Sequence, residues 1–167
     1  MKHKAIFLDR DGIINMERGE YTYRMEDFVF VEGLVKALKK FIKHDYKLII
    51  VSNQSGISKG VYSFEDVDKL HAHIQRYMRM NGIEIDEIYY CPHHPDTGLC
   101  ICRKPDSLLI EKAIARFNID PSLSYFIGDR ERDTAAAEKV NVKGFLIPSN
   151  TPLIELADKI TNLAHSN

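Results

Sequence analysis

The fold that this sequence predicts is decided by one stretch near its start, Ala5-Ile6-Phe7-Leu8-Asp9-Arg10-Asp11-Gly12. Four apolar residues in a row, with the strand formers Ile and Phe at their centre, predict a β-strand that is buried on both faces. Two carboxylates and a glycine follow directly. In an open parallel sheet the carboxyl ends of the strands form the ligand crevice, so acids placed there are suited to chemistry.

Asp9 and Asp11 are the first candidate functional residues. Gly12 allows the chain to bend, and the two carboxylates can therefore converge on one centre. Such a pair suits a hard divalent cation, because Mg²⁺ typically binds one or two carboxylates together with a substrate phosphate. The alternative is that Asp-Arg-Asp-Gly is a polar loop with a turn glycine.

Outward from this stretch, strand and helix patterns alternate along the chain. Further buried strands are predicted at residues 47–52, 85–90, 125–127 and 144–147. Helices are predicted over 34–42, 63–78, 108–117, around 135–137, and from Thr151-Pro152 onward, where Pro suits a first turn. This alternation predicts an α/β fold, a Rossmann-like parallel sheet with helices on both faces.

The composition is typical of a soluble globular protein and indicates a single domain over residues 1–167. The chain has no apolar run of about 18 residues and no signal-peptide pattern at its start, so we expect a cytoplasmic protein. Its 23 basic and 24 acidic residues give a net charge of -1, which provides no broad field for nucleic acid or a membrane. We expect a monomer that acts on a small molecule.

Polar residues follow the other predicted strands at the same edge of the sheet. Ser52 and Asn53 end the second strand, and Asp129 ends the fourth, with Asp133 four residues on. With Lys104 added, the edge holds acids for a metal ion, groups for phosphate oxygens and a cation, which together indicate phosphoryl transfer. Taken singly, Ser52 is equally well a strand-end cap, Lys104 a solvated charge and Asp129 a helix N-cap.

All three cysteines lie in one stretch, residues 91–102. Cysteine in a cytosolic protein is more often metal-binding or catalytic than disulfide-bonded, and soft ligands this close suit tetrahedral Zn²⁺. The predicted ligands are Cys91, His93, Cys100 and Cys102, although His94 could replace His93. A site closed by four protein ligands leaves no position for water, so we predict a structural zinc that orders the loop and aims Arg103 and Lys104 into the crevice. The alternative is reduced cysteines in an ordinary loop.

Taken in order, these motifs resemble those of the haloacid dehalogenase superfamily of aspartate-nucleophile phosphatases, and the resemblance covers nearly the whole chain. The motif residues are Asp9-x-Asp11-Gly12, Ser52-Asn53, Lys104 and Gly128-Asp129-x-x-x-Asp133. One departure is Ile13, where the family usually has Thr or Val.

The resemblance implies a role for each motif residue. Asp9 would attack phosphorus to give an aspartyl-phosphate, while Asp11 would protonate the leaving alkoxide and later activate water. The Mg²⁺ ligands would be Asp9, the backbone carbonyl of Asp11, and Asp129, with Asp133 in support. The residues that bind the transferring phosphoryl group would be Ser52, Asn53 and Lys104. A carboxylate cannot approach a phosphate dianion without cations, and Lys104 with Mg²⁺ would supply them.

The cysteine loop narrows the resemblance to a zinc-containing branch, which includes heptose bisphosphate phosphatases and histidinol phosphatases. Like that branch, this sequence has no large inserted helical cap, which implies an open site. Candidate contacts for the part of the substrate outside the transferred phosphate are Gln54, Ser55, Arg103 and Arg130. For Arg130, a solvated charge at a helix start is equally consistent.

Within that branch the sequence resembles more closely the phosphatases of D-glycero-D-manno-heptose 1,7-bisphosphate, through residues 27–30, 53–57 and 89–95. The short loop between Pro95 and Cys100 is instead similar to that of histidinol phosphatases. The resemblance therefore implies removal of the 7-phosphate in lipopolysaccharide precursor biosynthesis, with histidinol phosphate as the alternative substrate. A bisphosphate needs a second cationic contact, which arginines in this crevice can supply.

Two other functions are less favoured by the sequence. A polynucleotide 3'-phosphatase would use the same chemistry, but the net charge of -1 and the lack of a basic stripe argue against it. A zinc-stabilised binding module without turnover would lack Asp9, Asp11 or Lys104, and all of these are present.

Overall fold

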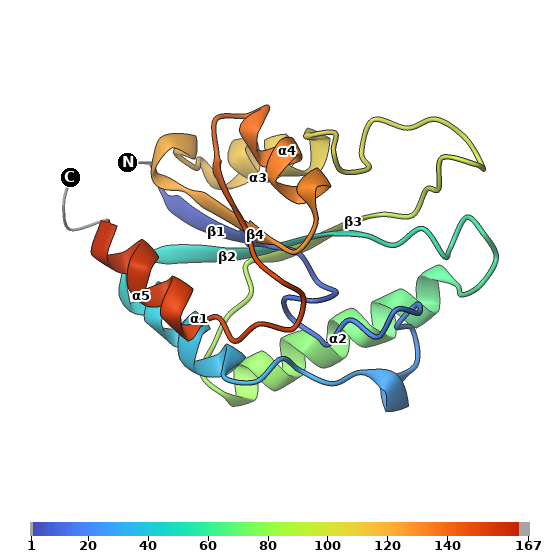
Figure 1. The fold of residues 1–167 in the computed structure, drawn as a ribbon, viewed down its shortest axis with the longest axis horizontal. Helices are drawn as coiled ribbons and strands as arrows, with labels where there is room; N and C mark the ends of the chain where they lie inside the picture. Colours follow the sequence, from blue (N-terminus) through green and yellow to red (C-terminus); the bar gives the residue numbers. More distant parts are fainter. Residues whose placement is uncertain (1, 164–167) are drawn as a thin grey trace.

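β1 (Lys4–Leu8), the strand formed by the apolar run, lies at the centre of the sheet in the computed structural model, which describes residues 2–163 (Figure 1). The other strands are β2 (Tyr46–Asn53), β3 (Glu87–Cys91), β4 (Tyr125–Gly128) and β5 (Lys143–Leu146). They pair in parallel in the order β3-β2-β1-β4-β5, which confirms the predicted α/β fold. Because β1 pairs with both β2 and β4, the strand ends that carry the motifs are neighbours.

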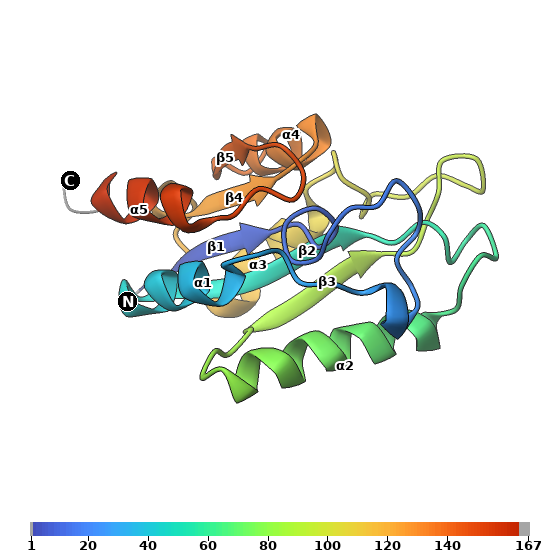
Figure 2. The ribbon, with the colours of Figure 1, turned by 60° about the horizontal axis from the view of Figure 1, so that its bottom comes forward.

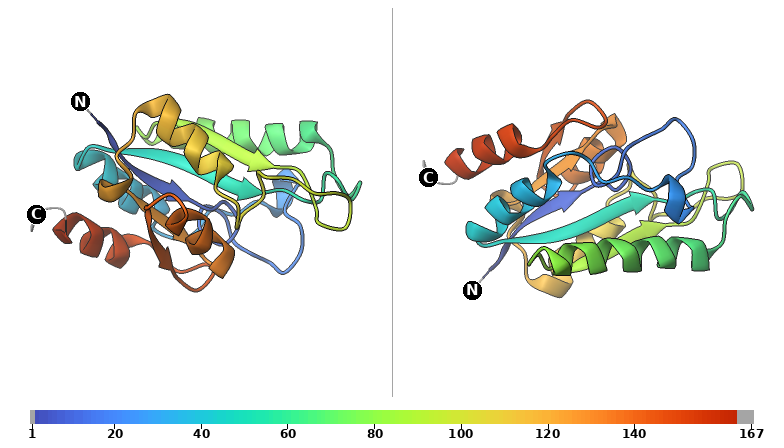
Figure 3. Two further views of the ribbon diagram at one scale, coloured as in Figure 1. Left: turned by 90° about the horizontal axis from the view of Figure 1, so that it is seen from above. Right: turned by 90° about the horizontal axis from the view of Figure 1, so that it is seen from below.

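Helices cover both faces of this sheet. One face carries α1 (Leu34–Lys43), α2 (Phe64–Met80) and α5 (Ile154–Leu163), and the other carries α3 (Leu108–Phe117) and α4 (Glu131–Glu138), as Figure 2 and Figure 3 show. In β1, Ile6 and Leu8 belong to the core on the first face, and Ala5 and Phe7 to the core on the second. A strand buried on both faces needs a continuous apolar run, which explains this sequence.

Residues 16–31, which we call the strap, connect the end of β1 to the segment before α1. Backbone hydrogen bonds fix both of its ends, from Met16 N to Val29 O (2.8 Å) and from Val31 N to Ile14 O (3.0 Å). The strap contains one short 3-10 helix, Met25–Asp27. In the described chain, the connections at the carboxyl end of the sheet are loops and this one turn, so the edge stays open, as the capless fold predicts.

The last helix begins later than predicted. The sequence predicts a start at Thr151-Pro152, whereas α5 starts at Ile154. A turn occupies the preceding residues, since Thr151 Oγ1 donates to Pro148 O (2.7 Å). The bounds of β3 and β5 also differ from the predicted ranges by one or two residues. No helix within residues 2–163 is long and apolar enough to span a membrane.

Candidate active site

Asp9 lies directly after β1 at the open edge of the sheet, and only 5% of its surface is exposed. Its Oδ1 accepts a hydrogen bond from Arg10 N (2.7 Å) and lies 2.9 Å from Lys104 Nζ. Burial raises the pKa of Asp9 to about 7, although the charge of Lys104 acts to lower it. The carboxylate therefore needs more positive charge nearby than Lys104 alone provides.

Lys104 is a buried cation with 1% exposure. Its Nζ lies 2.8 Å from Asp133 Oδ1 and donates to Val51 O (2.7 Å). Burial alone would lower the pKa of Lys104, but Asp9 and Asp133 raise it above its ordinary value. Asn53 holds the backbone of Lys104, because its Oδ1 accepts from Lys104 N and its Nδ2 donates to Lys104 O, both at 3.0 Å. The predicted phosphate ligand Asn53 is thus also a clamp on the lysine.

Asp9, Asp129 and Asp133 form a carboxylate cluster, with one oxygen of each within 4.8 Å of the others. Asp129 follows β4 and accepts a hydrogen bond from Ser149 Oγ (2.5 Å). Asp133, fully buried in the first turn of α4, accepts from Arg130 N (3.0 Å). Three acids around one lysine leave an excess of negative charge, and hard oxygen ligands suit Mg²⁺. The donor set therefore fits a divalent cation.

Gly12 allows the carboxylate cluster to close around the end of β1. Its φ of +84° is unfavourable for residues with a side chain, and a Cβ atom there would lie 2.4 Å from Asp129 Oδ2. Any other residue at this position would push Asp129 out of place.

Asp11 is held by donors on both of its carboxylate oxygens. Its Oδ1 accepts from Arg10 Nη2 (2.8 Å), Arg10 Nε (3.3 Å) and Asn15 Nδ2 (3.0 Å), and its Oδ2 accepts from Gln54 Nε2 (3.0 Å). Burial alone would raise the pKa of Asp11, but the Arg10 charge and these donors hold it below its ordinary value. Because Oδ1 is saturated, Oδ2 is the oxygen that can carry a proton.

Gln54 connects Ser52 with Asp11 through hydrogen bonds. Gln54 Nε2 donates to both Asp11 Oδ2 and Ser52 Oγ (2.7 Å), so its two amide hydrogens are engaged. The Ser52 hydroxyl accepts this bond and keeps its own hydrogen for another acceptor. Gln54, for which the sequence predicts a substrate contact, therefore contacts two motif residues here.

A pocket of about 260 Å³ opens beside Asp9 and Asp11. The other predicted site residues that line it are Asn53, Gln54, Ser55, Arg103, Asp129 and Arg130. Arg103 Nη1 donates to His93 O (3.1 Å), and Arg130 lies 3.9 Å from Glu17 Oε2. Both guanidinium groups are thus near the pocket with N–H donors still to spare.

The pocket also contains residues that sequence analysis did not assign to the crevice, among them His94, which it named only as an alternative zinc ligand. These are Arg10, Glu17, Glu20, Tyr21, Thr22, Tyr62, His94 and Arg132. Those from the strap carry no local signal, because neither periodicity nor motif spacing marks where a loop folds back. Arg10 did carry a sequence signal, because it is a positive charge between two acids. In the structure it is 1% exposed, and its Nη2 donates to Thr22 O (2.8 Å).

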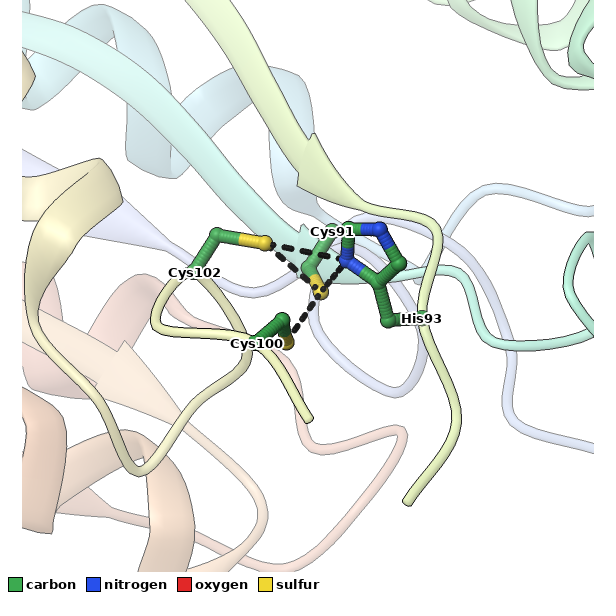
Figure 4. Close-up of side chains that lie close together, drawn as sticks. All are labelled: Cys91, His93, Cys100 and Cys102. Atoms are coloured by element: carbon green, nitrogen blue, oxygen red, sulfur yellow. Dashed lines mark hydrogen bonds between the residues drawn. The ribbon is translucent and has the colours of Figure 1, made fainter. Parts of the chain in front are cut away.

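The cysteine loop brings four soft ligand atoms together beyond the end of β3 (Figure 4). Cys91 Sγ lies 3.1 Å from Cys102 Sγ, 3.7 Å from Cys100 Sγ and 3.5 Å from His93 Nδ1. Ligands of a tetrahedral zinc ion with Zn–S bonds of about 2.3 Å are separated by roughly 3–4 Å. The geometry and chemistry of this set therefore fit Zn²⁺.

The two histidines of this loop have different partners. His93 Nδ1 lies 3.3 Å from Cys102 Sγ, within the ligand set. His94 Nδ1 instead accepts a hydrogen bond from Asp96 N (3.1 Å). Of the two, which the sequence leaves open as alternatives, His93 is the one that lies among the candidate ligands in this structure.

A family model described as HAD-hydrolase-like matches residues 101–161 of this chain. The D-glycero-beta-D-manno-heptose-1,7-bisphosphate 7-phosphatase of Haemophilus ducreyi is 42% identical over 149 residues, which cover 86% of this chain and 81% of that protein. The D-glycero-alpha-D-manno-heptose-1,7-bisphosphate 7-phosphatase of Campylobacter jejuni is 41% identical over 150 residues, which cover 90% of this chain and 84% of that protein. The chain belongs to the family of these heptose bisphosphate phosphatases.

A solved structure agrees with this assignment. The D,D-heptose 1,7-bisphosphate phosphatase from B. bronchiseptica, complexed with magnesium and phosphate, is similar with a TM-score of 0.85 and 25% identity. The match covers 98% of this chain and 99% of that one. The fold and the phosphatase class predicted from the sequence are therefore confirmed.

Proposed function

We propose that this phosphatase removes the 7-phosphate of D-glycero-D-manno-heptose 1,7-bisphosphate. The observation that carries the proposal is the buried Asp9–Lys104 pair beside Asp11 and the pocket, in a chain whose curated relatives are named for this reaction. Relatives of both anomeric names are similar to this chain to nearly the same degree. The proposal therefore leaves both anomers as substrates to be tested.

In the proposed mechanism, Asp9 attacks phosphorus and forms a bond between its carboxylate and the phosphoryl group, while the bond from phosphorus to the sugar oxygen breaks. Asp11 gives the proton on Oδ2 to the departing oxygen. It then removes a proton from water, which attacks phosphorus, releases phosphate and regenerates Asp9. The negative charge of an incoming phosphate favours the protonated form of Asp11, against the effect of Arg10.

The residues that would hold Mg²⁺ are Asp9, the backbone carbonyl of Asp11, and Asp129. The ion would neutralise charge that develops on the transferring phosphoryl group. Asp133 is already engaged by Lys104 and Arg130 N, and this supports a role in fixing Lys104. Ser52, with its free hydroxyl hydrogen, would bind a phosphoryl oxygen. Lys104, whose three N–H groups are engaged by Asp9, Asp133 and Val51 O, would act on the phosphoryl group through its charge.

Replacement of Asp11 by Asn is expected to lower kcat on the order of 100-fold or more, the usual scale of a general acid–base contribution. Asn keeps the size of the side chain and can accept hydrogen bonds, but it cannot deliver a proton. Phosphate affinity, measured by product inhibition, should change little. An equal loss of phosphate binding would show instead that Asp11 acts only as a ligand.

The substrate is tested by comparing kcat/KM for heptose 1,7-bisphosphate and for histidinol phosphate. We expect the bisphosphate to be preferred, because Arg103 and Arg130 beside the pocket favour a remote phosphate over an ammonium group. Arg103→Gln should reduce this preference. A higher kcat/KM for histidinol phosphate would overturn the substrate and leave the phosphatase class standing.

A further inference from the structure

Tyr62 lies in the loop before α2 and is absent from the motifs, yet it is joined to Asp11 through one residue. Its hydroxyl donates to Gln54 Oε1 (2.9 Å), and Gln54 Nε2 donates to Asp11 Oδ2 (3.0 Å). Tyr62 is 7% exposed and Gln54 1% exposed. Both side chains are therefore largely buried in the wall of the pocket, and hydrogen bonds in such surroundings are stronger than in bulk water.

The Gln54 amide has a definite orientation in this structure. Its nitrogen donates to Asp11 Oδ2 and to Ser52 Oγ. The amide oxygen then faces Tyr62, whose hydroxyl must donate. Burial raises the pKa of Tyr62 to about 12, which keeps this hydroxyl protonated. Tyr62 thus fixes the orientation of the Gln54 amide.

The ring of Tyr62 is itself held tightly. Tyr23 of the strap stacks on it at 5.2 Å between centroids, and Tyr21 meets its edge at 5.6 Å. On the loop side, a Cβ atom on Gly56 would lie 2.0 Å from Tyr62 Cε1, so only glycine leaves room for the ring. The hydroxyl is therefore presented to Gln54 from a fixed position.

We propose that Tyr62 is a positioning residue for proton transfer, acting through Gln54 to keep Oδ2 of Asp11 turned toward the leaving oxygen. Arg10 and Asn15 hold Oδ1 and Gln54 holds Oδ2, so these donors together fix the single torsion that orients the planar carboxylate, and Gln54 is the one that contacts Oδ2. This inference rests on the proposed function, because it assigns Asp11 as the acid. It adds a residue from outside the phosphatase motifs.

The decisive test compares Tyr62→Phe with wild type on two phosphate esters, the sugar bisphosphate and p-nitrophenyl phosphate. For each, kcat/KM reports the transfer to Asp9, the first irreversible step. The sugar alkoxide needs a proton to leave, whereas p-nitrophenolate does not. We expect kcat/KM to fall roughly tenfold for the sugar bisphosphate, the scale of one buried hydrogen bond, and less than about twofold for p-nitrophenyl phosphate.

Two further variants separate positioning from packing. Tyr62→Phe should cause no additional loss when added to Asp11→Asn, because no proton donor remains to be oriented. Gln54→Leu interrupts the same chain at its middle residue. Because Gln54 also contacts Ser52, both esters should lose kcat/KM, with the larger loss for the sugar bisphosphate. This variant therefore tests the inference even if Tyr62→Phe fails to fold. The matched control is Tyr90→Phe, which removes an exposed hydroxyl bonded to Asp68 (3.3 Å) and should leave both esters unaffected.

The inference is overturned if Tyr62→Phe matches wild type, or if both esters lose kcat/KM equally. An equal loss for both esters together with a lower melting temperature would identify a structural role for Tyr62. An equal loss that comes only from a raised KM would identify Tyr62 as a substrate contact. Failure of the proposed function is distinguishable, because wild-type enzyme would then not hydrolyse the sugar bisphosphate at all.

Discussion

Asp9→Asn is expected to abolish turnover while the fold remains intact. An amide cannot form the covalent bond to phosphorus, and loss of a covalent nucleophile lowers kcat by a factor on the order of 10⁴ or more. Lys104 would keep two of its contacts, with Asp133 and Val51 O, so the buried cation is not left without a partner. Steady-state kinetics beside a thermal melt test both parts of this expectation.

Asp9→Asn should not lower the stability of the folded protein, although it abolishes activity. Because folding raises the pKa of Asp9 from 3.8 to about 7, this carboxyl destabilises the fold increasingly as the pH rises above about 4, and the effect is complete above about 7. The neutral Asn carries no such penalty. In metal-free buffer at pH 8, the melting temperature of Asp9→Asn should therefore equal or exceed that of wild type. Appreciable activity in this variant would remove the aspartyl-phosphate mechanism.

The second large effect concerns the cysteine loop, for which we propose one structural zinc per chain. Cys102→Ser should release the metal and lower the melting temperature on the order of 5–15 °C, because metal binding energy becomes folding energy. Activity should fall with it, since Cys102 is two residues from Lys104. Metal analysis of protein purified without added zinc checks the occupancy directly.

A matched control lies in the same loop. Leu99 is fully exposed and offers no metal ligand, so Leu99→Ser should retain zinc, stability and turnover. Wild-type protein that is free of zinc yet fully stable and active would contradict the structural role of this loop.

The sheet and the position of the acids were predictable because their signals are local. A run of four apolar residues followed by Asp-x-Asp-Gly specifies both a buried strand and the polar groups at its end. The order of the motifs along the chain then places three strand ends together once the sheet is known to be parallel. Register and pairing partners follow from the structure alone.

The parts that were not predicted depend on contacts between distant segments. The strap meets Tyr62 through rings about forty residues apart in the sequence, and no periodic pattern records such a meeting. The orientation of the Gln54 amide depends on both neighbours, so its side-chain type alone does not reveal what it contacts. The sequence also does not distinguish His93 from His94. The fold of the loop alone directs the His93 side chain toward Cys102 and the His94 side chain toward Asp96 N.

The central position of β1 has a consequence for the chain as it leaves the ribosome. β1 is made first, but its partner β4 begins only at Tyr125, on the order of ten seconds later at typical rates of synthesis. Until then one side of β1 is an unpaired strand edge, apolar from Ala5 to Leu8, which is the kind of surface that pairs with other nascent chains. The growing polypeptide therefore depends on shielding of this edge until β4 emerges.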